Sequence, residues 1–189
     1  MKTLHRFLPP LTLLLLAGCD LLPQPQADTR RHFTLSGPPA APALADGLAV
    51  RPVQLAGHLH NRAMAVRVAE NEIIYIEDAL WAEPLDQAIT QLLRARLGSV
   101  GGGGAVTVQV QRFELVRPES NTVRLAASYT IDRPGAPVRQ ATFNASPRAW
   151  TGSDYGTLVG LLREAVGELG DAIAATASAP AGTDAVEKK

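Results

Sequence analysis

Residues Trp81–Leu97, WAEPLDQAITQLLRARL, form the stretch that decides the fold. Apolar side chains recur in it at the spacing of an amphipathic helix with one buried face. Pro84 suits the first helical position, where its missing N–H costs no hydrogen bond, and Gly98 offers a left-handed residue at the end. We therefore predict a helix that packs on a sheet formed by the segments around it, through Leu85, Ala88, Ile89, Leu92, Ala95 and Leu97.

The segments on both sides of this helix have the alternating pattern of β-strands. The candidate strands are residues 32–35, 48–55, 64–68, 73–76, 106–116, 123–132 and 138–145. Pro52 marks an irregular position in the second of them. A second helix is predicted from a cap at Ser153 or Asp154 to about Thr176, and its four glycines suggest close packing on the sheet. The pattern predicts a single α+β domain with a mixed or antiparallel sheet and two main amphipathic helices packed on it.

The N-terminus has the features of a lipoprotein signal peptide. Lys2 and Arg6 precede an apolar run, residues 11–17, that is too short to span a bilayer as a helix. The run ends in Leu16-Ala17-Gly18-Cys19, which resembles a bacterial lipobox, and Cys19 is the only cysteine in the chain. The resemblance makes Cys19 the lipidated first residue of the mature protein. The alternative is an ordinary secretory signal with a chance cysteine.

On this reading the chain has four parts. Residues 1–18 are a signal peptide and residues 19–31 a lipidated linker, because that stretch has little apolar surface to bury. Residues 32–176 are the folded domain. Residues 177–189 are mostly small and polar, and this composition predicts a disordered tail. Lys plus Arg equals Asp plus Glu at 18 each, so composition gives no indication of nucleic-acid binding.

We find no pattern of residues that predicts catalysis. Gly152–Gly156 resembles a hydrolase nucleophile turn only loosely, and Ser153 is better explained as a helix cap. His58 and His60 would face the same side of a strand, but zinc needs three or four ligands and the sequence supplies no others at a suitable spacing. Glu77-Asp78 is expected in a solvated loop rather than as an acid–base pair. The sequence therefore predicts no catalytic residue, no metal ligand and no cofactor.

Trp81 and Trp150 stand at equivalent junctions between a strand and a helix. We interpret both as staples that pack at the start of the helix that follows. The alternative is that they line an apolar surface that contacts a partner or lipid.

Several motifs resemble one protein family. They are Val53-Gln54-Leu55 on a strand, the turn 57–62, the hairpin residues Asn71-Glu72-Ile73, the helix start Trp81–Leu85 and Arg112-Phe113-Glu114. Together they resemble the ABC-type transport auxiliary lipoproteins, the PqiC/YmbA family. Ala56 and His58 differ from the proline and tyrosine expected in that turn.

The resemblance implies a non-catalytic lipoprotein that docks or anchors the periplasmic conduit of an MCE-type (mammalian cell entry) ABC transport system. The implied partners are an MCE-domain periplasmic protein with its ABC permease and ATPase, the membrane through lipid on Cys19, and further copies of the chain in a homo-oligomer. The implied cargo is phospholipid or another hydrophobic molecule. The family favours the outer membrane, whereas Asp20 resembles an inner-membrane retention signal. The alternatives are a stand-alone periplasmic lipid-binding lipoprotein and an envelope hydrolase that uses Ser153 or His58.

Overall fold

The computed structural model of the chain describes residues 28–35, 37, 44–117, 120–152 and 154–179. The predicted signal peptide, Cys19 and most of the predicted linker and tail lie outside this part of the chain. Within it, no helix combines the length and the apolar character that a membrane span requires.

In the part of the chain that the structure describes, the strands form one mixed sheet of nine strands. Along the main path the order is β1-β5-β4-β6-β7-β8, with β2 and β3 paired to β6, and β9 paired to β7. The pairs β1·β5, β2·β6, β3·β6 and β4·β6 are parallel and the others antiparallel. The strands are β1 (Arg31–Phe33), β2 (Ala49–Val50), β3 (Gln54–Leu55), β4 (Ala63–Ala69), β5 (Glu72–Trp81), β6 (Ala105–Val116), β7 (Thr122–Asp132), β8 (Arg139–Asn144) and β9 (Arg148–Ala149).

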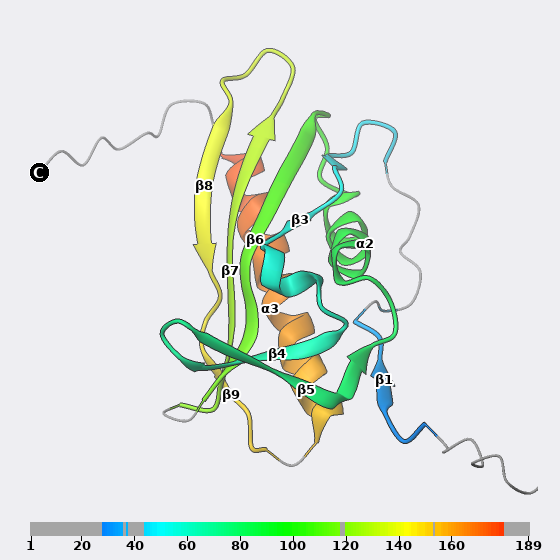
Figure 1. The fold of residues 1–189 in the computed structure, drawn as a ribbon. Coiled ribbons are helices and arrows are strands. Elements are labelled where there is room, and N and C mark those ends of the chain that lie inside the picture. The colour runs from blue at the N-terminus through cyan, green and yellow to red at the C-terminus, as the bar shows by residue number, and fades with distance from the viewer. Residues whose placement is uncertain (1–27, 36, 38–43, 118–119, 153, 180–189) are drawn as a thin grey trace, which may run out of the picture.

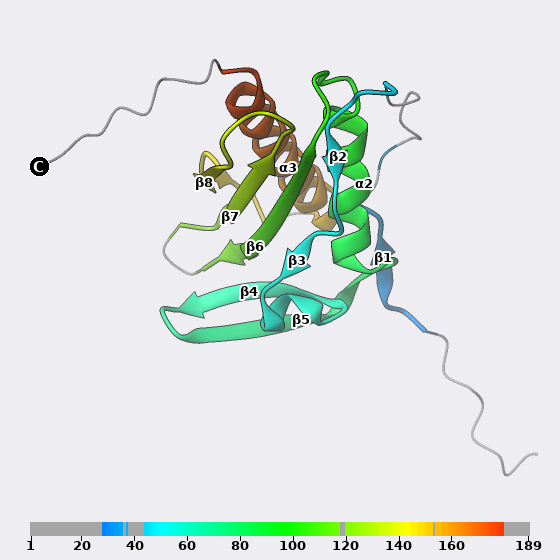
Figure 2. The same ribbon diagram turned by 90° about the horizontal axis from the view of Figure 1, so that it is seen from above.

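Two long helices cover one face of this sheet. They are α2 (Leu85–Leu97) and α3 (Tyr155–Ser178), and a short 3₁₀ helix, η2, covers Gly57–His60. Figures 1 and 2 show α3 behind β6 and β7 and α2 beside it along β2, while the β4–β5 hairpin crosses on the opposite side from α3. The structure confirms the predicted α+β fold with two helices on a mixed sheet.

The core lies between the helices and the inner face of the sheet. Ile89 and Leu93 of α2 and Leu169 of α3 are fully buried there. Alternate residues of β6 and β7, including Val108 and Leu125, point into the same core because successive side chains of a strand face opposite sides. The predicted alternation in both strands is confirmed.

The ends of α2 differ from the prediction. Pro84 is the N-cap, with φ −58° and ψ 127°, rather than the first helical residue, so the helix begins at Leu85. Gly98 has right-handed φ, −61°, so the prediction of a left-handed stop there is wrong. Positive φ occurs further along, at Gly102, Gly103 and Gly104, within the glycine run. The helix ends without a left-handed glycine because the Gly98 N–H still bonds to the Arg94 carbonyl.

Two other predictions are corrected by the structure. The predicted strand 48–55 is two short strands, because Pro52 has no N–H and Val53 N–H donates to Thr90 Oγ1 of α2 instead. Glu77-Asp78 lies within β5, which continues to Trp81, and not in a loop.

The glycines of α3 do not mark packing on the sheet. A Cβ on Gly170 would lie 3.1 Å from Cγ of Arg96 on α2, whereas nothing lies within 4 Å of one on Gly160 or Gly167. Gly170 therefore permits close approach of the two helices to each other.

Candidate functional site

The chain enters the domain beside the N-terminus of α3. β1 pairs in parallel with the last residues of β5, and the Arg31 guanidinium lies 3.4 Å from an Asp154 carboxylate oxygen. The Phe33 ring contacts the Tyr155 ring edge-on, with centroids 6.3 Å apart. Any anchor upstream of Asp28 therefore pulls on the domain at this corner, seen at the lower right of Figure 1.

Both tryptophans are part of the core. Trp81 is 4% exposed and packs on Phe113, and Trp150 is 3% exposed and stacks on Tyr155. The Trp150 indole N–H also donates to the Asp154 carbonyl, 2.9 Å away, at the cap of α3. These contacts confirm Trp150 as a staple at the start of α3. Trp81 is buried as well, but the ring on which it packs belongs to β6 and not to α2. The burial of both residues contradicts the alternative that they line a contact surface.

The structure does not bring the other sequence candidates together into a reactive site. His58 and His60 lie in η2 rather than on a strand. Across the part of the chain that the structure describes, no group of three or more His, Cys, Asp or Glu side chains could hold a metal ion. Ser153 and Cys19 lie outside the described residues.

A buried charged cluster lies where η2, β4 and β6 meet. Glu114 is 1% exposed, and its two carboxylate oxygens accept from Nε and Nη2 of Arg67 at 2.5 and 3.2 Å. Arg112 Nε lies 3.8 Å from the same carboxylate, and His58 Nε2, which is buried without a hydrogen-bond partner, lies 3.7 Å from it. A carboxylate this deeply buried needs such partners to stay charged.

Sequence reasoning missed this cluster. Arg112-Phe113-Glu114 is visible as a motif, but simple alternation from Val106 and Val110 places Glu114 on the helix-covered face of β6. A register shift in β6 between Val110 and Arg112 leaves Gln111 without a cross-strand partner in β7, so the residues after it change face. The shift brings Glu114 under η2, and Tyr75 fixes η2 by donating to the His58 carbonyl at 2.9 Å.

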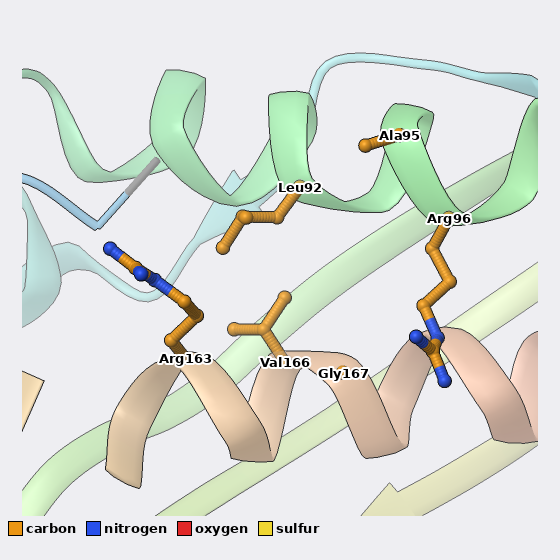
Figure 3. Close-up of a pocket in the computed structure, with 6 residues that line it drawn as sticks. All are labelled: Leu92, Ala95, Arg96, Arg163, Val166 and Gly167. Atoms are coloured by element: carbon orange, nitrogen blue, oxygen red, sulfur yellow. The ribbon is translucent and has the colours of Figure 1, made fainter. Parts of the chain in front are cut away.

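A surface groove lies between α2 and α3 (Figure 3). Its volume is about 330 Å³, with Leu92 and Val166 pointing toward each other across it and an arginine at each end. Arg96 is bound to Asp171 at 2.6 and 2.7 Å, and Arg163 donates to the Leu35 carbonyl at 2.9 Å. Since both guanidinium groups already have partners, the groove offers a ligand mainly apolar contact.

A second hollow, of about 150 Å³, lies at the C-terminal end of α3. Two arginines that line it donate to the last carbonyls of the helix, Arg133 to Ala177 and Arg139 to Thr176. These bonds satisfy carbonyls that have no partner within the helix, so the arginines act as its C-terminal cap.

Ion pairs hold α3 to the end of the sheet. Arg148 of β9 contacts Glu164 and Glu168 of α3. The side-chain bond from Arg148 holds the pKa of Glu168 below its usual value, with a smaller effect in the same direction from the Ser146 backbone N–H. The backbone N–H groups of Thr157 and Gly156 likewise lower the pKa of Asp154, the N-cap of α3.

Comparison with known proteins gives one family. The family model described as "ABC-type transport auxiliary lipoprotein component" matches residues 33–174. A comparison with curated proteins finds no match.

Two solved structures share the fold. One is the crystal structure of an uncharacterised protein, with TM-score 0.65 and 18% identity, covering 79% of this chain and 99% of the other. The second is a Xanthomonas campestris protein of the DUF330 family, with TM-score 0.58 and 19% identity, covering 80% of this chain and 94% of the other.

Proposed function

The chain belongs to the family of ABC-type transport auxiliary lipoprotein components, and we propose that it serves such a system as a membrane-anchored docking component without chemistry of its own. The match to 33–174 includes both long helices up to Ala174 and all strands from β2 on. This match is the observation that carries the proposal, since it extends over the whole folded core.

The proposed anchor is lipid on Cys19. Cys19 precedes Asp28, the first described residue, by nine residues, which span at most about 30 Å when extended. Such a tether would hold the domain close to the membrane surface, with the corner at Arg31 and Asp154 nearest to it. The family favours the outer membrane and Asp20 the inner one, so the proposal is an envelope location facing the periplasm.

The proposed partners are an MCE-domain periplasmic protein with its ABC permease and ATPase, and the proposed cargo is phospholipid or another hydrophobic molecule. In this role the domain docks or anchors the conduit rather than carrying cargo itself. The α2–α3 groove supports this choice, because about 330 Å³ is near the lower limit for the site of a drug-sized ligand. A lipid with two acyl chains needs more enclosed apolar space than the groove provides.

A genetic test addresses the function directly. A strain without this chain and a strain without the ABC permease should show the same sensitivity to detergents, and the double deletion should be no more sensitive than either. Additive sensitivity would show that the chain acts outside the transport system.

A matched variant tests the anchor. Cys19→Ala should give a folded domain released from the membrane and should fail to complement the deletion. Gln24→Ala, elsewhere in the predicted linker, is the control and should complement. Full activity of Cys19→Ala, or its retention in the membrane fraction, would contradict the anchoring proposal.

A further inference from the structure

The sheet has one face that neither long helix covers. α2 and α3 pack on the opposite side, so β6, β7 and β8 turn this face to the viewer in Figure 1. Cross-strand register places Thr107, Thr130 and Gln140 in one row, and Gln109, Ser128 and Thr142 in the next. All six side chains are uncharged hydrogen-bonding groups, half-buried or exposed. We call this solvent-facing side of β6–β8 the open face.

Positive charge collects at one end of the open face, next to the β4–β5 hairpin. Register puts Arg124 directly opposite Glu114, and Arg112 lies on the same side. Arg67 already binds both oxygens of Glu114, so Arg112 and Arg124 leave this end with two positive charges in excess. The Arg112 side chain is 48% exposed. The Arg124 side chain is exposed and makes no hydrogen bond or ion pair with any residue that the structure describes.

The rest of the open face does not neutralise this charge. Register with Ala105 places Asp132 on the open face too, but at the far end of β7, eight residues from Arg124. At about 3.3 Å per residue that separation is roughly 26 Å, more than two Debye lengths at physiological salt. Arg112 and Arg124 are therefore available to an anionic partner.

The kind of partner follows from the charge and shape of this surface. Attraction to an anionic membrane takes a cluster of about four to eight basic residues, more than this end of the face carries. The neutral amide and hydroxyl rows fit the polar rim of a protein–protein interface, and arginine is enriched in such interfaces.

We propose that the open face is a docking surface for a protein that presents carboxylate side chains to Arg112 and Arg124. This inference rests on the proposed function in taking that protein to be a subunit of the transport system. The buried Glu114 anchors Arg67 and restrains Arg112 from below, so the basic end is largely ordered before the partner arrives. The neutral rows then provide hydrogen bonds without adding charge that would have to be desolvated.

The test uses the full-length chain in its own envelope. A photo-crosslinking phenylalanine derivative replaces Ser128 or Thr142 on the open face, or Ala175 on the exposed side of α3 as a control. Crosslinked proteins are identified by mass spectrometry. The open-face positions should crosslink to an acidic segment of a transport-system subunit, whereas Ala175 should not.

A charge variant tests the role of Arg124. Arg124→Glu should weaken binding to the crosslinked subunit about tenfold and reduce its salt dependence, because a favourable charge contact becomes a repulsive one. Arg62→Glu, on the turn before β4, is the control because Arg62 is also exposed and without a partner among the described residues. Arg124→Gln removes the charge without placing a second carboxylate opposite Glu114, so it should fold as the wild type and still weaken binding.

The outcomes separate this inference from the proposed function. If the transport subunits co-purify with the wild type and with Arg124→Glu equally, and no open-face position crosslinks to them, the docking surface is wrong and the function stands. If no transport subunit co-purifies at all, the function itself fails. Binding of the chain to vesicles of phosphatidylglycerol and phosphatidylethanolamine that Arg124→Gln abolishes, without protein crosslinks, would assign the face to lipid and overturn the inference.

Discussion

Arg67→Met should destabilise the domain far more than an arginine substitution on a surface normally does. Arg67 donates two charge-assisted hydrogen bonds to Glu114, whose side chain is fully buried. Removing one member of a buried ion pair costs about 3–5 kcal/mol, because the other charge loses its compensation. Arg112 remains 3.8 Å from the carboxylate and recovers part of this, so we expect a loss near the lower limit, about 3 kcal/mol. Methionine keeps the apolar stem, so the loss comes from the charge and not from packing.

The assay is urea unfolding of a soluble version of the chain that begins at Asp28, followed by circular dichroism. Arg112→Met is the matched control, since it is half-exposed and lies at the limit of an ion pair, and should cost less than about 1 kcal/mol. Arg67→Met combined with Glu114→Leu should recover stability to within about 1 kcal/mol of the wild type, because no unpaired charge is left inside. A loss below about 1 kcal/mol for Arg67→Met, or no recovery in the double variant, would refute this reasoning.

Three further predictions concern the glycine turn after α2, an ion pair made by α3 and the N-cap of α3. Gly104→Ala should cost more than about 2 kcal/mol in thermal unfolding, because φ is +93° and a Cβ would lie 2.3 Å from a backbone oxygen; Gly103→Ala, also left-handed but with open space around it, should cost only about 1 kcal/mol. The hydrogen bond from Arg148 lowers the pKa of Glu168 in the folded state. The ion pair therefore stabilises the fold above the pKa of Glu168 in the unfolded chain, about 4.3, and this stabilisation is lost as pH falls through the lower pKa of the folded state. Wild type should therefore lose more stability than Glu168→Gln between pH 6 and pH 3, and equal losses would contradict this assignment. Asp154→Ala removes the N-cap hydrogen bond of α3 and should lower the unfolding free energy by about 1 kcal/mol at neutral pH. An unchanged unfolding free energy would show that the Asp154 side chain does not stabilise the helix.

Elements with strong local signals were predictable from the sequence. The apolar stripe ending in Leu97 specifies α2, and alternation around Val108 and Leu125 specifies β6 and β7. Burial of Trp81 and Trp150 followed from their position before each helix. In each case the pattern within one segment decides the type of element, although α2 buries Leu93 where the sequence predicted Leu92 and Ala95.

Features that depend on distant contacts were not predictable. Gly98 stays right-handed because the turn is completed further on, at Gly102–Gly104, where the chain meets Asp132 and Arg133. The division of 48–55 depends on Thr90 of α2, which accepts the Val53 N–H. No local pattern encodes either contact.

The charged cluster and the open face were missed for the same reason. Simple alternation along β6 assigns Glu114 to the face of Val110 until the shift at Gln111 and the placement of η2 are known. The excess charge of Arg112 and Arg124 becomes visible only after Arg67, from another strand, is assigned to Glu114. Recognition of the family supplied the function class, because no residue pattern in the sequence by itself predicts a function.

The most direct test of the central claim is affinity purification of the lipidated full-length chain from detergent-solubilised envelopes after crosslinking in living cells. Mass spectrometry would compare the recovered proteins with those from an unrelated lipoprotein expressed at the same level. We predict strong enrichment of an ABC permease and its MCE-domain partner over the control. Recovery of lipid without any transport subunit would contradict the account and would make the chain a lipid carrier.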